Sequence, residues 1–518
     1  MIADTSQNFP RAASPVVTQD KDRERAWFAF ALPAVMAILL ALVPILGRAA
    51  AGPMLLILVP LVLWTAFRDT ERALYVYIAW CWMDGTIRGL LGQDPVSIVA
   101  RDLVLGIVAV GWGVQRLQTR SLNPLRCPPG TLLIALFVIN CLLQVANPYS
   151  LGLVQSIGGL KLHLSAIPLV FVAYDMIRRR AQVRALFLFL TLATLVVGFV
   201  SLVQYMGGKD WTWAHFPGTQ EVISQDMRSM TEGKQISEIA SFKPPGTTGF
   251  GGGTAMFISM VFPLTFALPM LFGKLCFPPR VRVCFLAILM AFVVIILINS
   301  VRSALVVAVS GVAVSVALIG PRLRARIKSA LLACLVLGLV AFTFSQTLSQ
   351  GGVTNRFAST LSDPADALHQ DRQTFFDNGF DIIRLSPMGV GLGRVGAAAG
   401  RLRSGPGNGG LEFTPFSEAY LGNIIFETGL IGAILILSIT LSFIRRGYLA
   451  MAYLHDPDDK FLAAAILAVL AVVLANFFLS PILLGPPGSV LFWLLSGVLL
   501  RVFVSPNVAS APQEKQET

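Results

Sequence analysis

Long apolar windows separated by short polar stretches dominate this chain. Counting them gives about 14 candidate membrane spans when roughly 17 to 25 residues are required for each helix. They lie near residues 27–46, 51–67, 73–84, 97–115, 130–146, 153–176, 184–206, 252–273, 281–298, 303–319, 327–347, 419–443, 461–483 and 487–504. Because a soluble domain cannot hide so many apolar segments, the pattern predicts an all-α polytopic membrane protein.

Composition agrees with this class of protein. Of 518 residues, 55% are hydrophobic and 13% are charged. A net charge of +12 would suit a nucleic-acid partner, but the basic residues form short clusters between apolar segments, so we expect none. The six cysteines lie in or beside apolar segments without a CxxC or Cys/His spacing. We therefore expect neither disulfides nor a metal site, and no cofactor.

The basic clusters also predict which side of the membrane each loop faces. They alternate along the chain with loops that hold at most one cation, and by the positive-inside rule they are cytoplasmic. The clusters are Arg68/Arg72, Arg116/Arg120/Arg126, Arg178/Arg179/Arg180/Arg184, Lys274/Arg280/Arg282, Arg322/Arg324/Arg326/Lys328 and Arg445/Arg446/Lys460.

This alternation divides the chain into tails, helical blocks and two long loops. The N-terminal tail (1–25), followed by a retained first span rather than a signal peptide, and the C-terminal tail (505–518) are both cytoplasmic. Transmembrane helices occupy 26–206, 252–347 and 419–504. The loops 207–251 and 348–418 then both face outward.

The second outer loop, 348–418, concentrates ionisable residues between apolar segments, and we expect chemistry there. Between Arg372 and Pro387, the side chains of Phe376, Phe380 and Ile383 fall on one helical face. This predicts an amphipathic helix that lies on the bilayer or packs on the outer ends of the spans. The run Gly389 to Gly393 predicts a turn whose backbone approaches a neighbour closely; phosphate binding is a weaker alternative.

The first outer loop contains KDWTWAHFPG (209–218) and SFKPPGTTGFGGGTA (241–255). Its glycine and proline density predicts an irregular but shaped backbone rather than a helix. Aromatic side chains in the two loops are candidates either to stack on sugar rings or to anchor at the membrane interface. They are Trp211, Trp213, Phe216, Phe413 and Phe416.

Ionisable residues within spans usually have a partner or a function. Here they are Arg101, Asp102, Lys161, His163 and Arg302, all toward the outward ends of their spans. Arg101 is expected to pair with Asp102 or a neighbour. Lys161 and Arg302 have no acid nearby in sequence, which favours a functional role. Outward-facing cations in a partly dry site suit a pyrophosphate, such as that of a polyprenyl-linked sugar.

Several stretches resemble the O-antigen ligase and polymerase superfamily, in the same order. SEAYLGNIIFETGLIG (417–432) resembles the segment that closes its large periplasmic loop. The other stretches resemble its basic residue before a proline-containing span, its Arg-x-x-Gly-Thr-Phe loop, its Ser-Arg-(Gly/Ser)-Ala helix start and its Pro-x-x-Gly-x-Gly pattern. They are GGLKLHLSAIPLVF (158–171), FKPPGTTGFGGGTAMFISMVFPL (242–264), NSVRSALVVAVSG (299–311) and RQTFFDNGFDIIRLSPMGVGLG (372–393).

The resemblance implies a metal-independent membrane glycosyltransferase at the periplasmic face of a bacterial inner membrane. It implies an undecaprenyl-pyrophosphate-linked oligosaccharide as donor, membrane lipids around the chain, and partner proteins of polysaccharide assembly and export. Carried over by position, Arg302, Lys161 and Arg372 would contact the donor pyrophosphate. Lys243 would stand where the family has arginine before Gly-Thr.

One departure from the family affects the function it implies. Ligases that attach glycan to lipid A core carry a His-Asn pair near Ser417 and Glu418, and no histidine is present there. This favours a polymerase of exopolysaccharide, capsule or O-antigen repeat units. Glu418 is the candidate general base, or alternatively a helix N-terminal residue stabilised by the dipole. The other candidates for the base are Asp363, Asp366, Asp371 and Glu412. Glu427 is expected to be a structural pairing residue.

Two other functions stay open. One is a ligase that transfers glycan to a lipid or protein acceptor. The other is a transporter or flippase of lipid-linked saccharides, although the two halves of the chain show no convincing internal repeat.

Overall fold

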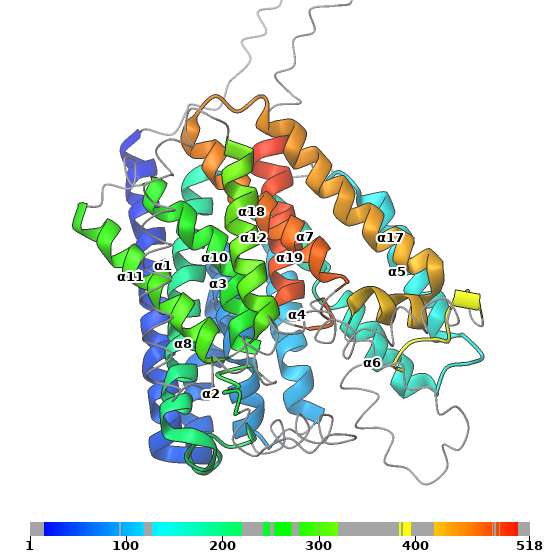
Figure 1. The fold of residues 1–518 in the computed structure, drawn as a ribbon, viewed down its shortest axis with the longest axis horizontal. Coiled ribbons are helices and arrows are strands. Elements are labelled where there is room, and N and C mark those ends of the chain that lie inside the picture. The colour runs from blue at the N-terminus through cyan, green and yellow to red at the C-terminus, as the bar shows by residue number, and fades with distance from the viewer. Residues whose placement is uncertain are drawn as a thin grey trace, which may run out of the picture.

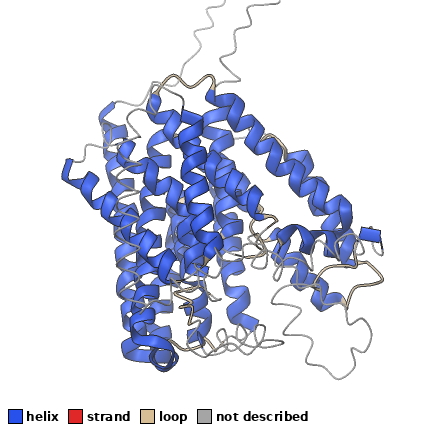
Figure 2. Ribbon diagram, in the orientation of Figure 1, coloured by secondary structure: helices blue, strands red, loops and turns tan. Residues whose placement is uncertain are grey.

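The computed structural model describes most of the apolar part of the chain. The described residues are 15–92, 95–118, 127–219, 242–248, 253–271, 279–299, 301–319, 383–384, 387–394, 419–478, 480, 483–485 and 487–505. Within these residues the regular structure is helical throughout, as Figure 2 shows. The predicted all-α class is therefore confirmed for the described part of the chain.

The helices follow the predicted apolar windows closely (Figure 1). In chain order the helices are α1 (Pro15–Leu46), α2 (Ala51–Arg68), α3 (Thr70–Leu90), α4 (Pro95–Gln118), α5 (Thr131–Val145), α6 (Leu153–Leu164), α7 (Pro168–Met176), α8 (Arg180–His215), α10 (Gly253–Ala267), α11 (Pro279–Ile298), α12 (Arg302–Ile319), α17 (Tyr420–Met451), α18 (Pro457–Asn476) and α19 (Gly488–Leu499). Short turns η1 (Gly47–Ala50), η2 (Leu268–Leu271) and η3 (Leu500–Val504) extend α1, α10 and α19.

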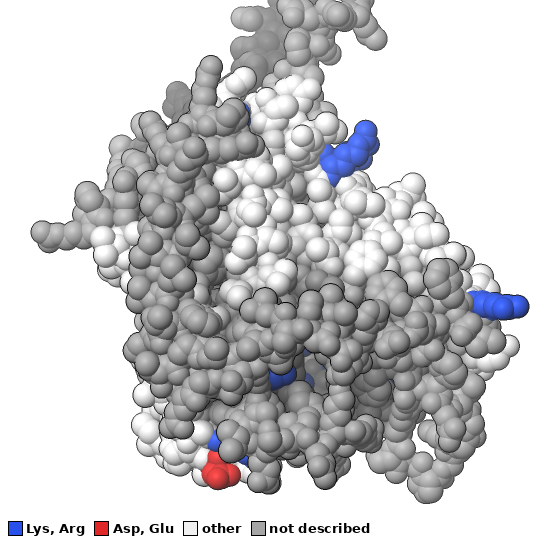
Figure 3. Space-filling model, viewed as in Figure 1, with Lys and Arg blue, Asp and Glu red and all other residues white. Residues whose placement is uncertain are grey.

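Within the part of the chain that the structure describes, length and apolarity mark four segments as able to cross a membrane: Arg23–Arg68, Leu153–Met176, Arg180–His215 and Tyr420–Met451. Five shorter apolar helices accompany them, among them Gly253–Ala267 and Gly488–Val504. The described part of the face drawn in Figure 3 is mostly uncharged, as a lipid-facing surface requires. The count of about 14 spans stays a prediction, and 327–347 lies outside the described residues.

Helix α3 is longer and more central than its predicted span of 73–84. It extends over 21 residues, and most of its side chains are buried against α1, α2, α4 and α8. Asp84 and Arg88, at the end of the predicted window and beyond it, pair with each other inside the helix at 3.0 Å.

Two glycines break helices that would otherwise run on. Gly208 in α8 and Gly429 in α17 both adopt φ near +75° with an extended ψ, a region that is essentially limited to glycine. After Gly208, residues up to His215 are helical again. The prediction of an irregular backbone for Lys209–His215 was therefore wrong, because one glycine redirects the chain and the following residues have ordinary helix propensity.

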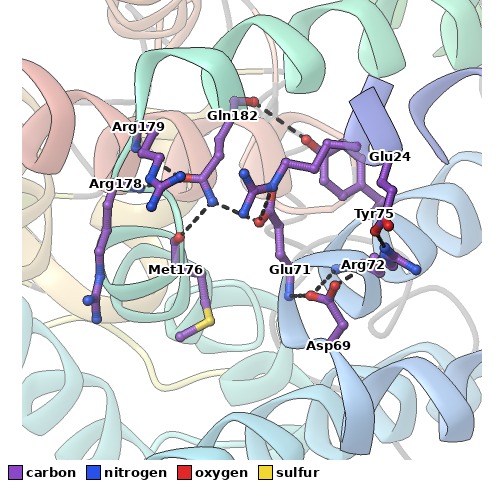
Figure 4. Close-up of polar contacts among 10 residues, drawn as sticks. Glu24, Asp69, Glu71, Arg72, Tyr75, Met176, Arg178, Arg179 and Gln182 are labelled. Carbon is purple, nitrogen blue, oxygen red and sulfur yellow. Dashed lines mark hydrogen bonds and ion pairs between the residues drawn. The ribbon is translucent and has the colours of Figure 1, made fainter. Parts of the chain in front are cut away.

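One end of the bundle, here called the arginine end, gathers several of the basic clusters that were predicted to be cytoplasmic. Around Glu71, Arg25 Nε lies 3.0 Å from Glu71 Oε2, and Gln182 Nε2 donates to the same oxygen at 2.7 Å (Figure 4). Further pairs there are Arg72–Glu24, Arg116–Asp175, Arg178–Asp175 and Arg180–Asp459. Contacts between α1, α3, α4, α7, α8 and α18 thus bring these predicted loops to one side; their compartment stays a prediction.

Candidate functional site

The opposite end of α3 carries a chain of alternating charges, here called the charge chain. Arg88 Nε lies 3.0 Å from Asp84 Oδ2, and Arg101 on α4 lies 3.5 Å from the same oxygen. Arg101 also contacts Asp102 Oδ1 at 3.2 Å, which confirms the expected pairing of these neighbours. Asp102 Oδ2 in turn lies 2.6 Å from Lys161 Nζ on α6. The charge chain thus connects α3, α4 and α6 over three cations and two carboxylates.

The loop that carries Lys243 docks directly beside the charge chain. Gly85, next to Asp84, donates its N–H to Thr247 O at 3.0 Å, and the Thr247 hydroxyl donates to Trp82 O. On the other side of the loop, Gln204 of α8 bonds both the N–H and the carbonyl of Gly246, at 2.7 and 3.0 Å. Residues 242–248 are therefore anchored to α3 and α8, and Lys243 itself is half-buried.

The turn between α11 and α12 adjoins Ser201 of α8, which also lies beside the same loop. Asn299 Nδ2 donates to Ser201 Oγ at 3.2 Å, and a Cβ on Gly246 would lie 3.5 Å from Ser201 Cβ. Arg302, three residues later, is the first residue of α12. Three of the predicted donor-site positions, Lys161, Lys243 and Arg302, thus belong to adjoining segments at one end of the bundle, here called the loop end.

The remaining predicted site residues, Arg372 and Glu418, lie outside the described residues, as do Phe413 and Phe416. Of the predicted amphipathic helix, Ile383 and Arg384 are helical, and Ile383 packs against the core. In the first outer loop, Trp211 stacks on His215 at 4.5 Å and Lys209 Nζ lies 4.4 Å from the Trp213 ring. A sugar-stacking role for these aromatics stays a prediction.

The glycine run forms a turn, Pro387–Arg394, that is built into the protein and is here called the glycine turn. Gly389, Gly391 and Gly393 all adopt φ between +84° and +88°. A Cβ on Gly389 would come within 2.6 Å of Gly429 N, and one on Gly393 within 2.1 Å of Gln155 O. The predicted close approach is therefore confirmed, and the neighbours that it meets are the backbones of α17 and α6.

Backbone and amide hydrogen bonds hold this turn in place. Val390 N donates to Phe426 O at 2.8 Å, and Leu430 N donates to Pro387 O at 3.0 Å, on either side of the break at Gly429. Gln144 of α5 donates to Met388 O at 2.6 Å, and Asn147, in the turn after α5, donates to Gly389 O at 3.1 Å. The break in α17 exposes backbone groups that the turn then satisfies, as buried backbone requires.

The turn also meets a buried acid–histidine pair. Glu427 Oε1 accepts the backbone N–H of Arg394 at 2.7 Å, and Glu427 Oε2 lies 2.6 Å from His163 Nε2. Both side chains are fully buried. Glu427 was expected to pair structurally, but its partner lies 264 residues earlier in the chain, so no local pattern identifies it.

The helices and the charged residues of the loop end define a helical membrane protein with a polar site at one end. A comparison with protein families then indicates the class of enzyme. The family model described as O-antigen ligase matches residues 285–437, which include most of α11, all of α12, the glycine turn and the first part of α17. This confirms the resemblance to the O-antigen ligase-like superfamily over that region and supports a membrane enzyme of the ligase or polymerase type. A comparison with curated proteins returns no match.

Proposed function

We propose that this protein is a glycan polymerase that joins undecaprenyl-pyrophosphate-linked repeat units at the periplasmic face of a bacterial inner membrane. One observation carries the proposal. Lys161, the loop of Lys243 and the start of α12 at Arg302 belong to adjoining segments, connected through Asp84, Gly85, Thr247 and Ser201. Cations gathered from distant parts of the sequence beside a membrane suit an anionic lipid headgroup.

In this proposal Lys161, Lys243, Arg302 and Arg372 contact the donor pyrophosphate. Lys161 and Lys243 are half-buried, so water screens their charges less than it screens fully exposed ones. Such cations stabilise the negative charge that grows on the leaving pyrophosphate as the glycosidic bond breaks.

The chemical step is an inverting substitution at the anomeric carbon. The acceptor hydroxyl oxygen attacks that carbon, the carbon–oxygen bond to the pyrophosphate breaks, and undecaprenyl pyrophosphate leaves with the electron pair. Glu418 takes the hydroxyl proton as general base. The acceptor is a second lipid-linked glycan, so the product is a longer glycan on a lipid carrier, and the reaction uses no metal.

A ligase is the second candidate, and the printed description of the matching family favours it. A ligase uses the same donor site but transfers the finished glycan to another lipid or a protein. The absence of histidine at Ser417 and Glu418 is the observation that ranks the polymerase first.

Deleting the gene in its host and analysing lipid-linked glycans together with surface polymer tests the proposal. A polymerase predicts that single repeat units accumulate on the outer leaflet and long polymer disappears. Full-length polymer left on its carrier would identify a ligase instead. Repeat units held on the cytoplasmic leaflet would identify a transporter and overturn the mechanism.

A further inference from the structure

The His163–Glu427 pair occupies a junction that the proposed chemistry does not use. It joins α6 to α17 at 2.6 Å, and the other oxygen of Glu427 holds the backbone of Arg394 at 2.7 Å. One carboxylate therefore connects three segments that are far apart in sequence: α6, the glycine turn and α17. A fully buried carboxyl group is costly unless its oxygens find such donors.

Helix α6 also carries Lys161, two residues before His163. Through Lys161, α6 contacts Asp102 of the charge chain on α4. Through Gly159 it contacts the glycine turn, because a Cβ there would lie 2.2 Å from Gly393 N. The same short helix thus touches the charge chain on one side and the glycine turn on the other.

From these contacts we propose that Glu427 and His163 are positioning residues that fix the glycine turn relative to Lys161. Glu427 bonds both the turn and α6, so its side chain joins the turn to the helix that carries Lys161, beside the backbone contact of Gly159 with Gly393. This proposal rests on the proposed function, in which Lys161 contacts the donor. A shift of about 1 Å between groups that must cooperate lowers turnover by up to about 10²-fold.

The hydrogen bonds of His163 and Glu427 determine which substitutions keep the contact between α6, the glycine turn and α17. In Glu427→Gln one oxygen still accepts the Arg394 N–H, and the amide nitrogen donates to His163 Nε2. In His163→Gln the amide nitrogen reaches the position of Nε2 and still donates to Glu427. Glu427→Leu and His163→Leu remove these bonds at similar volume. Thr440→Val is the matched control, because Thr440 is buried in α17 and its hydroxyl donates to the carbonyl of Ile436 in the same helix.

A labelling measurement reports the docking of the turn without any substrate. Leu392 in the glycine turn is 0% exposed, whereas Met388 in the same turn is 62% exposed. In a variant whose native cysteines are replaced, Leu392→Cys is expected to resist a membrane-impermeant maleimide and Met388→Cys to react. Adding Glu427→Leu or His163→Leu is expected to raise labelling of Leu392→Cys at least tenfold, while Thr440→Val leaves it unchanged.

Activity of the full-length protein completes the test, with lipid-linked glycan from a deletion strain as substrate. Glu427→Leu and His163→Leu are expected to lower kcat by about 10²-fold with less than about a threefold change in KM. Both glutamine variants are expected to stay within about threefold of the starting protein. Unchanged labelling in Glu427→Leu, or full turnover despite increased labelling, would overturn the proposal. If Lys161→Gln stays fully active while labelling responds as expected, the donor site of the proposed function fails instead.

Discussion

Lys161 Nζ on α6 lies 2.6 Å from Asp102 Oδ2 on α4. Asp102 also contacts Arg101, which shares Asp84 with Arg88, so three cations face two carboxylates. The charge chain therefore keeps a net positive charge, and an anion that approaches it meets cations already held in position. Preorganised charges of this kind are the basis of the proposed donor site.

Removing the charge at Lys161 tests that site. Lys161→Gln is expected to lower glycan transfer by about 10- to 100-fold, because one charge-assisted bond to the donor is lost. Arg116→Gln is the matched control, since Arg116 pairs with Asp175 at the arginine end. Transfer is measured in membranes with equal amounts of each variant. An equal loss of glycan transfer in both variants would show that Lys161 affects transfer only by stabilising the folded protein.

Substituting two lysines near the first outer loop tests whether transfer depends on the donor site or only on positive charge in that region. Lys243→Ala is expected to lower transfer by about tenfold or more, because its loop is anchored beside the charge chain. Lys209→Ala is expected to retain transfer, because Lys209 lies over the Trp213 ring. The measurement is polymer length and amount in complemented cells. A larger loss of transfer in Lys209→Ala than in Lys243→Ala would show that Lys243 does not belong to the donor site.

The helix breaks at Gly208 and Gly429 allow the energetic cost of backbone strain to be separated from the cost of a steric clash. Among the described residues, no atom lies within 4 Å of a Cβ placed on Gly208, so Gly208→Ala is expected to cost only the strain of its backbone, about 1–3 kcal/mol. Gly429→Ala has the same strain, and its Cβ would also lie 2.5 Å from the Met388 carbonyl carbon. It is expected to destabilise the protein by at least about 2 kcal/mol more.

Thermal unfolding of the purified protein in detergent measures both glycine variants. A larger loss for Gly208→Ala would contradict the close approach between the glycine turn and α17.

The buried carboxyl group of Glu71, at the arginine end, is expected to make the stability of the folded protein depend on pH. Burial raises the pKa of Glu71 above its ordinary value, and Arg25 and Gln182 oppose this only partly. The folded state therefore binds a proton more tightly than the unfolded chain does. Stability from this group is present below the ordinary carboxyl pKa and is lost as pH rises through the folded pKa.

Glu71→Gln removes that titration. Between the ordinary carboxyl pKa and the higher folded pKa, the unfolding temperature of the parent protein is expected to fall with rising pH more than that of the variant. Thermal unfolding across this window, in one detergent and at constant ionic strength, measures the difference. Parallel curves for the two proteins would contradict it.

The fold was largely predictable because apolar windows determine where helices lie in a membrane protein. The window predicted at 153–176 is confirmed as one apolar span, within which Pro168 begins a separate helix, α7. The miss at Lys209–His215 has a local cause, because Gly208 redirects α8 without ending its helical run. The site was less predictable. Arg101 and Asp102 are neighbours in sequence, but Lys161 with Asp102 and His163 with Glu427 join segments far apart in the chain. Only tertiary packing brings those pairs together.

Reconstitution tests the central claim most directly. The purified protein is incubated with lipid-linked repeat units isolated from the deletion strain, and the products are separated by glycan length and by carrier. We expect longer glycans that remain on the lipid carrier, together with released undecaprenyl pyrophosphate, and little product from Lys161→Gln. Repeat units that stay at their original length, with no lipid pyrophosphate released, would contradict the account.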